Sequence, residues 1–198
     1  MEELRLDPGA YTGSYKLIGG RLSLDLVNTI SWPNTERRHD WLTTPANVSM
    51  WLEAVGLPPT DMDQSDLTDV GAIRSAVTEM LWPLAHNSRP TPAAGQRFNR
   101  LLTEAQTRRF IDPVNLTWTS KPPRRASDLL DPVLLDAADL ITDKNHDRLK
   151  HCPSCDWLFQ DHTRNGRRRW CDMADCGSRA KARSYYHRTK TERPSPIN

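Results

Sequence analysis

All four cysteines of this 198-residue chain lie in one stretch near its C-terminus, from Cys152 to Cys176. They are spaced C-x2-C, then 15 residues, then C-x4-C. Two close cysteine pairs separated by a longer insert are typical of a tetrahedral thiolate metal site, most often a zinc site. The sequence therefore predicts one zinc ion, and its predicted ligands are Cys152, Cys155, Cys171 and Cys176.

Two alternatives to a four-cysteine zinc site remain open at this point. Two disulfides would need an oxidising compartment, but the N-terminus is acidic where a secretory signal needs a basic start and an apolar core. A site of three cysteines and one histidine could use His151, His162 or His187, each of which has a plainer surface or packing role. Four thiolates would leave zinc no open position, so we expect a structural ion and no metal catalysis.

The cysteine-bearing segment is too short to bury a substantial apolar core of its own. Metal coordination supplies about 10 kcal/mol or more of folding free energy in small zinc modules. We expect Trp157, Phe159 and Trp170 to pack around the ion, between strands at Leu149–His151 and Leu158–Gln160. This module would be a treble-clef or ribbon-like zinc finger that ends in a helix.

The charge of the chain divides at the start of the predicted finger. Residues 148–198 hold 12 Lys/Arg against 5 Asp/Glu, whereas the preceding 147 residues hold 15 against 20; together these make the 27 basic and 25 acidic residues of the chain. A basic module beside an acidic body favours a polyanionic partner, nucleic acid before others. A solvated basic surface without a partner is the alternative.

The basic residues of the finger fall into two groups. The first surrounds an Asn-Gly turn signal, which predicts a hairpin with arginines on its descending arm. The second lies on a helix that Ser178 would cap, with Arg179, Arg183, Tyr186 and Lys190 on one face. The candidate nucleic-acid contacts are Arg164, Arg167, Arg168, Arg169, Arg179, Lys181, Arg183, Arg188 and Lys190.

The first 147 residues predict a mostly helical α+β domain with a small antiparallel sheet, large enough to bury its own core. Thr44-Pro45 and Thr91-Pro92 each place a cap before a proline at a helix start. The predicted strands are near Tyr15–Leu17, at Arg21–Val27 and within Arg109–Ser120, and the predicted helices follow Thr44, Ser65, Thr91 and Asp131, the last with Leu134, Leu135, Ala138 and Ile141 as its inner face. No apolar run is long enough to cross a bilayer.

The body contains no phosphate-binding loop, dinucleotide glycine motif or nucleophile elbow, so we expect no enzyme. A small-molecule or catalytic site in the body, with the finger as an interaction platform, is the alternative function. Asn28 and Thr29 would more simply close a local turn, and residues 31–43 would form a solvated loop. The candidate ligand-binding residues are Asp25, Asn28, Arg37, Arg38 and Asp40.

The cysteine segment resembles the bacterial CGNR-type zinc finger proteins. The likeness rests on Trp170-Cys171, the run from Cys176 to Arg179, the following A-K-A-R-x-Y-Y, and the preceding C-P-x-C and F-x-D. Ser178 stands where the family has asparagine; serine can cap a helix equally well, but a base contact made by that asparagine would be lost. Leu24–Thr29, Trp41-Leu42 and Trp51-Leu52 resemble the ABATE domain that precedes this finger, so the resemblance spans nearly the whole chain.

The resemblance implies a stress-induced transcription regulator with DNA as its partner. It implies zinc on the four cysteines and assigns no catalytic residue to the body. We therefore predict a cytoplasmic bacterial regulator with three parts: residues 1–147 as an ABATE-like domain that senses a small-molecule effector or forms a homodimer, 148–192 as the finger, and 193–198 as a disordered tail. RNA binding through Trp157, Tyr185 and Tyr186 is an alternative.

Overall fold

The computed structural model of the protein describes residues 3–11, 13–144 and 146–191, without the side chains of Glu3, His187, Thr189, Lys190 and Thr191. The predicted tail, 193–198, lies outside these residues. The helices are α1 (Leu22–Val27), α2 (Pro45–Ala54), α3 (Asp66–Ala85), α4 (Pro92–Arg108), α5 (Asp131–Thr142) and α6 (Ser178–Thr191), with 3-10 helices η1 (Ala126–Leu130) and η2 (His146–Arg148) and the π-helical turn η3 (Met173–Gly177).

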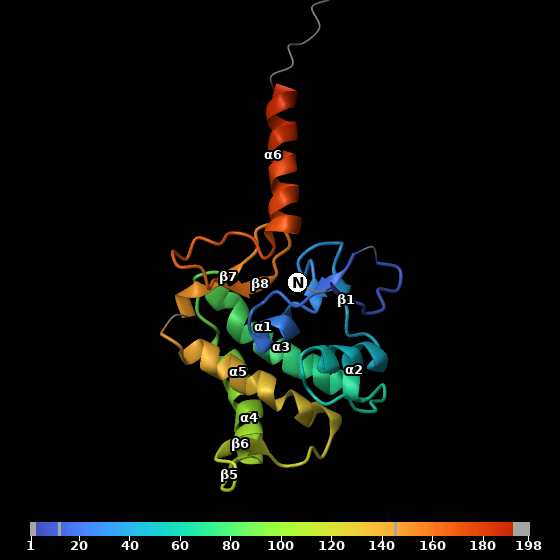
Figure 1. The fold of residues 1–198 in the computed structure, drawn as a ribbon, viewed down its shortest axis with the longest axis vertical. Coiled ribbons are helices and arrows are strands. Elements are labelled where there is room, and N and C mark those ends of the chain that lie inside the picture. Colours follow the sequence, from blue (N-terminus) through green and yellow to red (C-terminus); the bar gives the residue numbers. More distant parts are fainter. Residues whose placement is uncertain (1–2, 12, 145, 192–198) are drawn as a thin grey trace, which may run out of the picture.

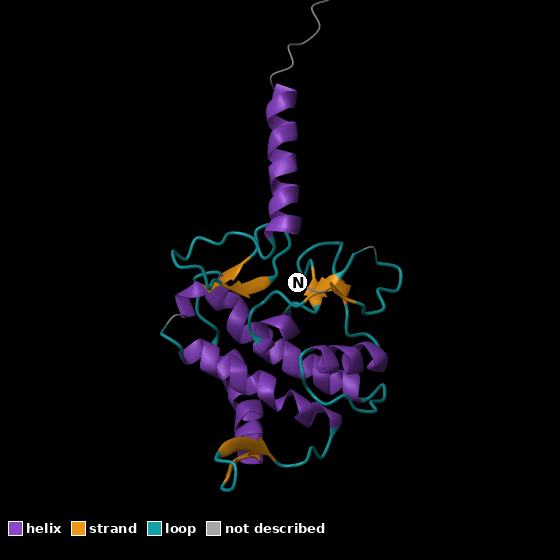
Figure 2. Ribbon diagram, in the orientation of Figure 1, coloured by secondary structure: helices purple, strands orange, loops and turns teal. Residues whose placement is uncertain are grey.

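Strands in this part of the chain form four separate antiparallel pairs. The pairs are β1 (Glu3–Leu4) with β2 (Tyr15–Lys16), β3 (Ile30–Ser31) with β4 (His39–Asp40), β5 (Arg109–Asp112) with β6 (Thr117–Ser120), and β7 (Leu149–His151) with β8 (Leu158–Gln160). Figure 1 shows α1 to α5 packed into one body, with β5–β6 at one end and α6 projecting from the other. Figure 2 shows that helices dominate the body, which confirms the predicted fold class of a mostly helical α+β protein with a finger that ends in a helix.

The helix starts predicted from cap-then-proline pairs are confirmed. The hydroxyl of Thr44 accepts a hydrogen bond from the Asn47 N–H, and that of Thr91 accepts one from the Ala94 N–H, both at 3.2 Å. These bonds satisfy backbone donors that the first turn of a helix leaves without partners. The threonines therefore fix where α2 and α4 begin.

The strand predicted at Arg21–Val27 is wrong, because Leu22–Val27 forms helix α1. Alternating leucines suggested one buried face, but Ser23 and Asp25 between them are buried as well. The Ser23 hydroxyl donates to the Asp136 carboxylate at 2.6 Å, and the Asp25 carboxylate accepts from the Gly19 N–H at 2.8 Å. Polar residues with such partners can be buried on every side of a helix. The alternation of the leucines therefore did not show that only one face of this segment is buried.

Two other apolar patterns were misread. The fully buried apolar residues of α5 are Val133, Leu134, Ala137 and Leu140. Of the four predicted positions, Leu134 is therefore confirmed, Ala138 and Ile141 are only partly buried against the core, and Leu135 does not belong to it. Residues 109–120 form a hairpin rather than one strand, and its apolar side chains are not core residues: Val114 is 85% exposed and Leu116 80% exposed.

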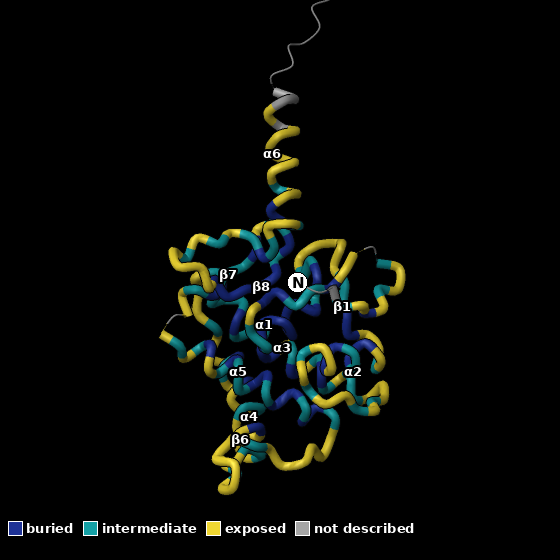
Figure 3. Tube along the Cα trace, viewed as in Figure 1, coloured by how far each residue is buried: buried dark blue, intermediate teal, exposed yellow. Residues whose placement is uncertain are grey.

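One continuous apolar core holds the body and the finger together. Trp51, Leu81 and Leu134 from the body belong to the same buried cluster as Leu158, Phe159 and the four cysteines. Figure 3 shows buried residues continuing from the helices of the body into β8, whereas α6 is exposed along most of its length. Trp157 and Phe159 are buried as predicted and Trp170 is partly buried, but the finger has no separate small core.

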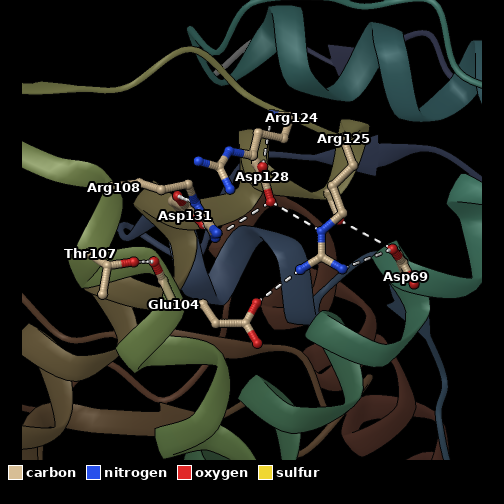
Figure 4. Close-up of polar contacts among 9 residues, drawn as sticks. Asp69, Glu104, Thr107, Arg108, Arg124, Arg125, Asp128 and Asp131 are labelled. Atoms are coloured by element: carbon tan, nitrogen blue, oxygen red, sulfur yellow. Dashed lines mark hydrogen bonds and ion pairs between the residues drawn. The ribbon is translucent and has the colours of Figure 1, made fainter.

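An ion-pair network joins α3, α4, η1 and α5 at the end of the body away from α6 (Figure 4). The Arg108 guanidinium donates to both oxygens of the Asp131 carboxylate, at 2.5 and 2.6 Å. Arg125 bridges Asp128 at 3.2 Å and Glu104 at 2.9 Å. Asp131 is the first residue of α5, where the positive end of the helix dipole also stabilises its carboxylate.

Asp25 gives the body a testable dependence on pH. Burial raises the pKa of its carboxyl to about 6, against the lowering effect of hydrogen bonds from the Gly19 and Ile18 backbone. A raised pKa in the folded state means that stability is lost as pH rises. Relative to Asp25→Asn, we expect the free energy of unfolding of the natural protein to fall by up to about 3 kcal/mol between about pH 4 and pH 7.

Urea unfolding of both proteins across this pH range measures the difference, in which other titrating groups cancel. Asp139→Asn, at an exposed position on α5, is the matched control and should show no such trend. A difference between the natural protein and Asp25→Asn that stays constant with pH would contradict the assignment of a costly buried charge.

Candidate metal centre and basic surface

The four cysteines come from a turn between two strands and from the approach to a helix. Cys152 follows β7 directly, and its N–H donates to the Trp157 carbonyl at 2.8 Å. The Asp156 N–H donates a hydrogen bond to the Cys152 carbonyl at 2.8 Å, and Asp156 has a φ of +62°. This turn presents Cys152 and Cys155 on one side, while Cys176 lies in η3, immediately before α6.

The sulfur atoms fit one divalent ion. All four cysteines are buried and free of disulfides, and their sulfur atoms lie within 4.8 Å of one another. A tetrahedron with Zn–S bonds of about 2.3 Å has S···S edges of about 3.8 Å. Cys171 Sγ lies 3.5 Å from Cys155 Sγ and 3.6 Å from Cys176 Sγ, close to that edge. The cysteines therefore form one structural zinc site, as predicted.

The four thiols are too close together to ionise independently of one another. Hydrogen bonds, the largest from Cys155, hold the pKa of the Cys152 thiol far below its usual range. The same kind of contact with Cys152 raises the pKa values of Cys155 and Cys171 far above theirs. A bound metal ion favours the thiolate form of all four cysteines, so binding should release protons and weaken in acid.

Arg179 lies beside the thiolates. Its guanidinium donates to Cys176 Sγ at 3.1 Å and pairs with the Asp175 carboxylate at 2.9 Å. Four thiolates carry twice the charge of one Zn²⁺ ion, so a neighbouring cation offsets the excess negative charge. The nucleic-acid contact predicted for Arg179 stays a prediction, and its position also gives it a role in supporting the metal site.

Asp161 organises the basic turn, and the sequence reasoning missed this role. Its buried carboxylate accepts from Lys150 Nζ at 2.8 Å, the Thr163 hydroxyl at 2.6 Å and the Arg168 N–H at 2.8 Å. Burial opposes the charged form, yet these hydrogen bonds hold the pKa of Asp161 well below its usual range. The F-x-D pattern, Phe159 to Asp161, was the available signal for this residue.

The arginines of this turn differ in what they can reach. The predicted Asn-Gly turn is present, with Gly166 at a φ of +60°, but the arginines after it follow a loop instead of a hairpin arm. Arg168 turns inward: its guanidinium donates to the Trp170 and Cys171 carbonyls and lies 4.5 Å from the centre of the Phe159 ring. Arg164, Arg167 and Arg169 are exposed.

Helix α6 carries the second group of cations. Lys181, Arg183 and Arg188 are exposed, and Arg183 also donates to the Ser154 hydroxyl at 2.9 Å, which ties the base of α6 to the first cysteine turn. Tyr185 and Tyr186 are 66% and 62% exposed. The side chains of Lys190 and His187 lie outside the described residues.

The histidine alternative for the metal site finds no support in the described part of the chain. The metal-ligating group found there consists of cysteines alone. The ring of His151 stacks on His86, with centroids 3.9 Å apart, and His162 is exposed beside Gly20.

Of the five candidate ligand residues of the body, Asn28 and Arg38 line the same cavity, and the other three do not. Asp25 is buried inside α1, and Asp40 forms a two-point ion pair with Arg74 at 2.7 and 2.5 Å. Arg37 lies 4.5 Å from the centre of the Trp32 ring and lines a cleft beside the metal site. Arg38 and Asn28 line a different cavity, between α3 and the finger.

Asn28 joins the body to the finger, so its assignment to a local turn is wrong. Its side-chain amide donates to the Leu158 carbonyl and accepts from the Leu158 N–H, both at 2.8 Å. Through these two hydrogen bonds, the edge of β8 pairs with a side chain that lies 130 positions earlier in the sequence. Nearby, the Gln160 N–H donates to the Gly19 carbonyl at 2.9 Å, and the Trp157 indole donates to the Ile30 carbonyl at 3.2 Å.

Comparison with known families gives two matches. The model of the ABATE family, described as "Putative stress-induced transcription regulator", matches residues 20–144. The model of the CGNR zinc finger matches residues 148–189. No curated protein matches the chain. Among the described residues, no helix has both the length and the apolar character needed to cross a bilayer.

The contact between Arg179 and Cys176 predicts an effect on metal affinity. Arg179→Met removes the cation and the N–H···S hydrogen bond while keeping much of the side-chain volume. We expect about tenfold weaker zinc binding, the lower end of the usual effect of removing a residue that supports a metal ligand. Competition with a chromogenic chelator measures the affinity.

Lys181→Met is the control, because Lys181 is exposed on the same helix and should leave zinc affinity unchanged. Equal zinc affinities for the Arg179→Met variant and the natural protein would show that Arg179 does not support the site.

Proposed function

Because the chain belongs to the ABATE family and ends in a CGNR zinc finger, we propose that it is a transcription regulator that binds DNA through the finger. One observation carries the proposal: α6 projects from the metal site and contains five Lys or Arg residues and no acid. A helix of this length extends about 21 Å, enough to lie along a DNA groove.

The metal site gives this helix a fixed base. Cys176 holds η3 to the ion, and α6 begins two residues later, at Ser178. The Arg183 contact with Ser154 adds a second attachment to the finger. A rigid support lowers the conformational entropy lost on binding, so the cations of α6 can meet phosphates at a smaller cost.

The basic turn provides a second set of phosphate contacts. Asp161 fixes the path of the turn, and Arg164, Arg167 and Arg169 project from it into solvent. Arg168 and Arg179 are committed to carbonyls and to the metal site, so we leave them out of the proposed contact surface. Phosphate contacts position a protein on DNA, while sequence is read at the base edges.

RNA binding is less well supported. A single-stranded RNA reader would need exposed aromatic side chains on which bases stack. Tyr185 and Tyr186 are exposed, but Trp157 is 8% exposed and donates its indole N–H to the body. Competition of unlabelled single-stranded RNA against bound duplex DNA distinguishes the two partners.

Salt dependence is the direct test of DNA binding. We expect the zinc-loaded protein to bind a mixed-sequence duplex, with log K falling linearly with log salt, by about 0.9 for each phosphate neutralised. Arg167→Ala combined with Arg169→Ala should reduce this slope by about 2. Fluorescence anisotropy between about 50 and 200 mM salt gives both slopes.

Arg100→Ala serves as the control, since Arg100 is exposed on α4, away from the finger, and should leave the slope unchanged. A slope near zero, or no binding at the lowest salt, would rule out a DNA contact by this surface.

A further inference from the structure

A cavity of about 310 Å³ lies between the body and the first cysteine turn. Its apolar wall includes Val27, Ile30 and the rings of Trp82 and Trp157. Its volume is at the lower end of the range for small-molecule sites, about 300–1,000 Å³. The cavity lies apart from the cations proposed to contact DNA.

The charged groups of the cavity are of two kinds. Arg74 is committed to the Asp40 carboxylate and the Thr29 hydroxyl, and Glu79 is committed to Arg97. The guanidinium of Arg38 has no ion pair or hydrogen bond with the described residues. Among the described residues, the basic group paired with the Asp156 carboxylate is His151 Nδ1, at 3.8 Å, and that imidazole carries a charge only when protonated. One cation and one anion therefore remain to meet a ligand.

We infer that this cavity binds a small amphoteric molecule with an apolar body, the chemistry of an apolar amino acid. Its carboxylate would face Arg38, its ammonium group would face Asp156, and its apolar part would lie against Trp82 and Trp157. Opposite charges at two points select for a molecule that carries both, because a ligand lacking one leaves a protein charge without a partner. The proposed function assigns no such ligand.

The position of the cavity links such a ligand to the finger. Asp156 and Trp157 belong to the turn that presents Cys152 and Cys155, and the Trp157 indole donates to the Ile30 carbonyl of the body. A molecule held between Arg38 and Asp156 would contact both parts at once. It would thereby favour the arrangement in which the finger and the body are joined. This consequence rests on the proposed function, whereas binding itself does not.

Calorimetric titration of the zinc-loaded, DNA-free protein tests the inference. The probes are L-leucine and L-phenylalanine, with 3-phenylpropionate and 2-phenylethylamine as analogues lacking the ammonium or the carboxylate group. We expect saturable binding of at least one amino acid. We also expect phenylpropionate to bind about tenfold more weakly than phenylalanine, as the loss of about 1.4 kcal/mol implies.

Three variants locate the site. Arg38→Met should weaken amino-acid binding about tenfold, whereas Arg37→Met, which alters the neighbouring residue in the other cleft, should change it less than about twofold. Asp156→Asn should remove the preference for phenylalanine over phenylpropionate. Asparagine tolerates the positive φ at this position, so the backbone should keep its shape. Ser75→Trp should block the cavity while the protein stays folded, since Ser75 is exposed on α3.

The absence of saturable binding by either amino acid would overturn the inference, as would unchanged binding by Arg38→Met or Ser75→Trp. Phenylpropionate binding as tightly as phenylalanine would replace the amphoteric ligand with a simple anion, which also contradicts the inference. Because DNA is absent, these results do not depend on whether the finger binds DNA.

Discussion

The C-terminal quarter of the molecule depends on four sulfur atoms sharing one cation. Cys152 and Cys155 come from a turn between two short strands, while Cys171 and Cys176 come from the other end of the insert. No disulfide joins them, and without a cation the thiols must share protons, because four crowded thiolates would repel one another. The ion therefore determines where α6 begins, and with it where the exposed cations lie.

The ion alone does not place the finger on the body. Asn28 completes the edge of β8 with two hydrogen bonds, and the Gly19 carbonyl accepts from Gln160. Gly19 is required here because a Cβ atom at this position would lie 2.6 Å from Cβ of Leu24. Together with the Trp157 indole, these contacts make the finger an extension of the body's core. An event at this boundary, such as binding in the adjacent cavity, would be transmitted to the cysteine turn by direct contact.

The sequence was most informative where one local rule decides the structure. The cysteine spacing predicted the metal site, and threonine before proline predicted the starts of α2 and α4, because each depends on near neighbours.

The sequence was misleading where the structure depends on contacts between residues that are far apart in the chain. Ser23 and Asp25 are buried because Asp136 and Gly19 accept or donate their hydrogen bonds, and these partners cannot be read from the alternation of leucines. Asn28 was also misassigned, since its partner, Leu158, is brought to it only by the folded chain. The contact of Arg179 with the Cys176 sulfur could not be read from the sequence for the same reason. The two-domain boundary at residue 147 and the homodimer remain predictions.

Amide hydrogen exchange of the zinc-loaded and the chelated protein tests most directly whether the ion holds the finger. On chelation, we expect the amides of the two cysteine turns and of α6 to lose protection, while those of α2 to α5 keep theirs because these helices carry no metal ligand and their apolar residues pack against one another. Metal-free protein whose cysteine turns and α6 stay as protected as in the loaded protein would contradict the account.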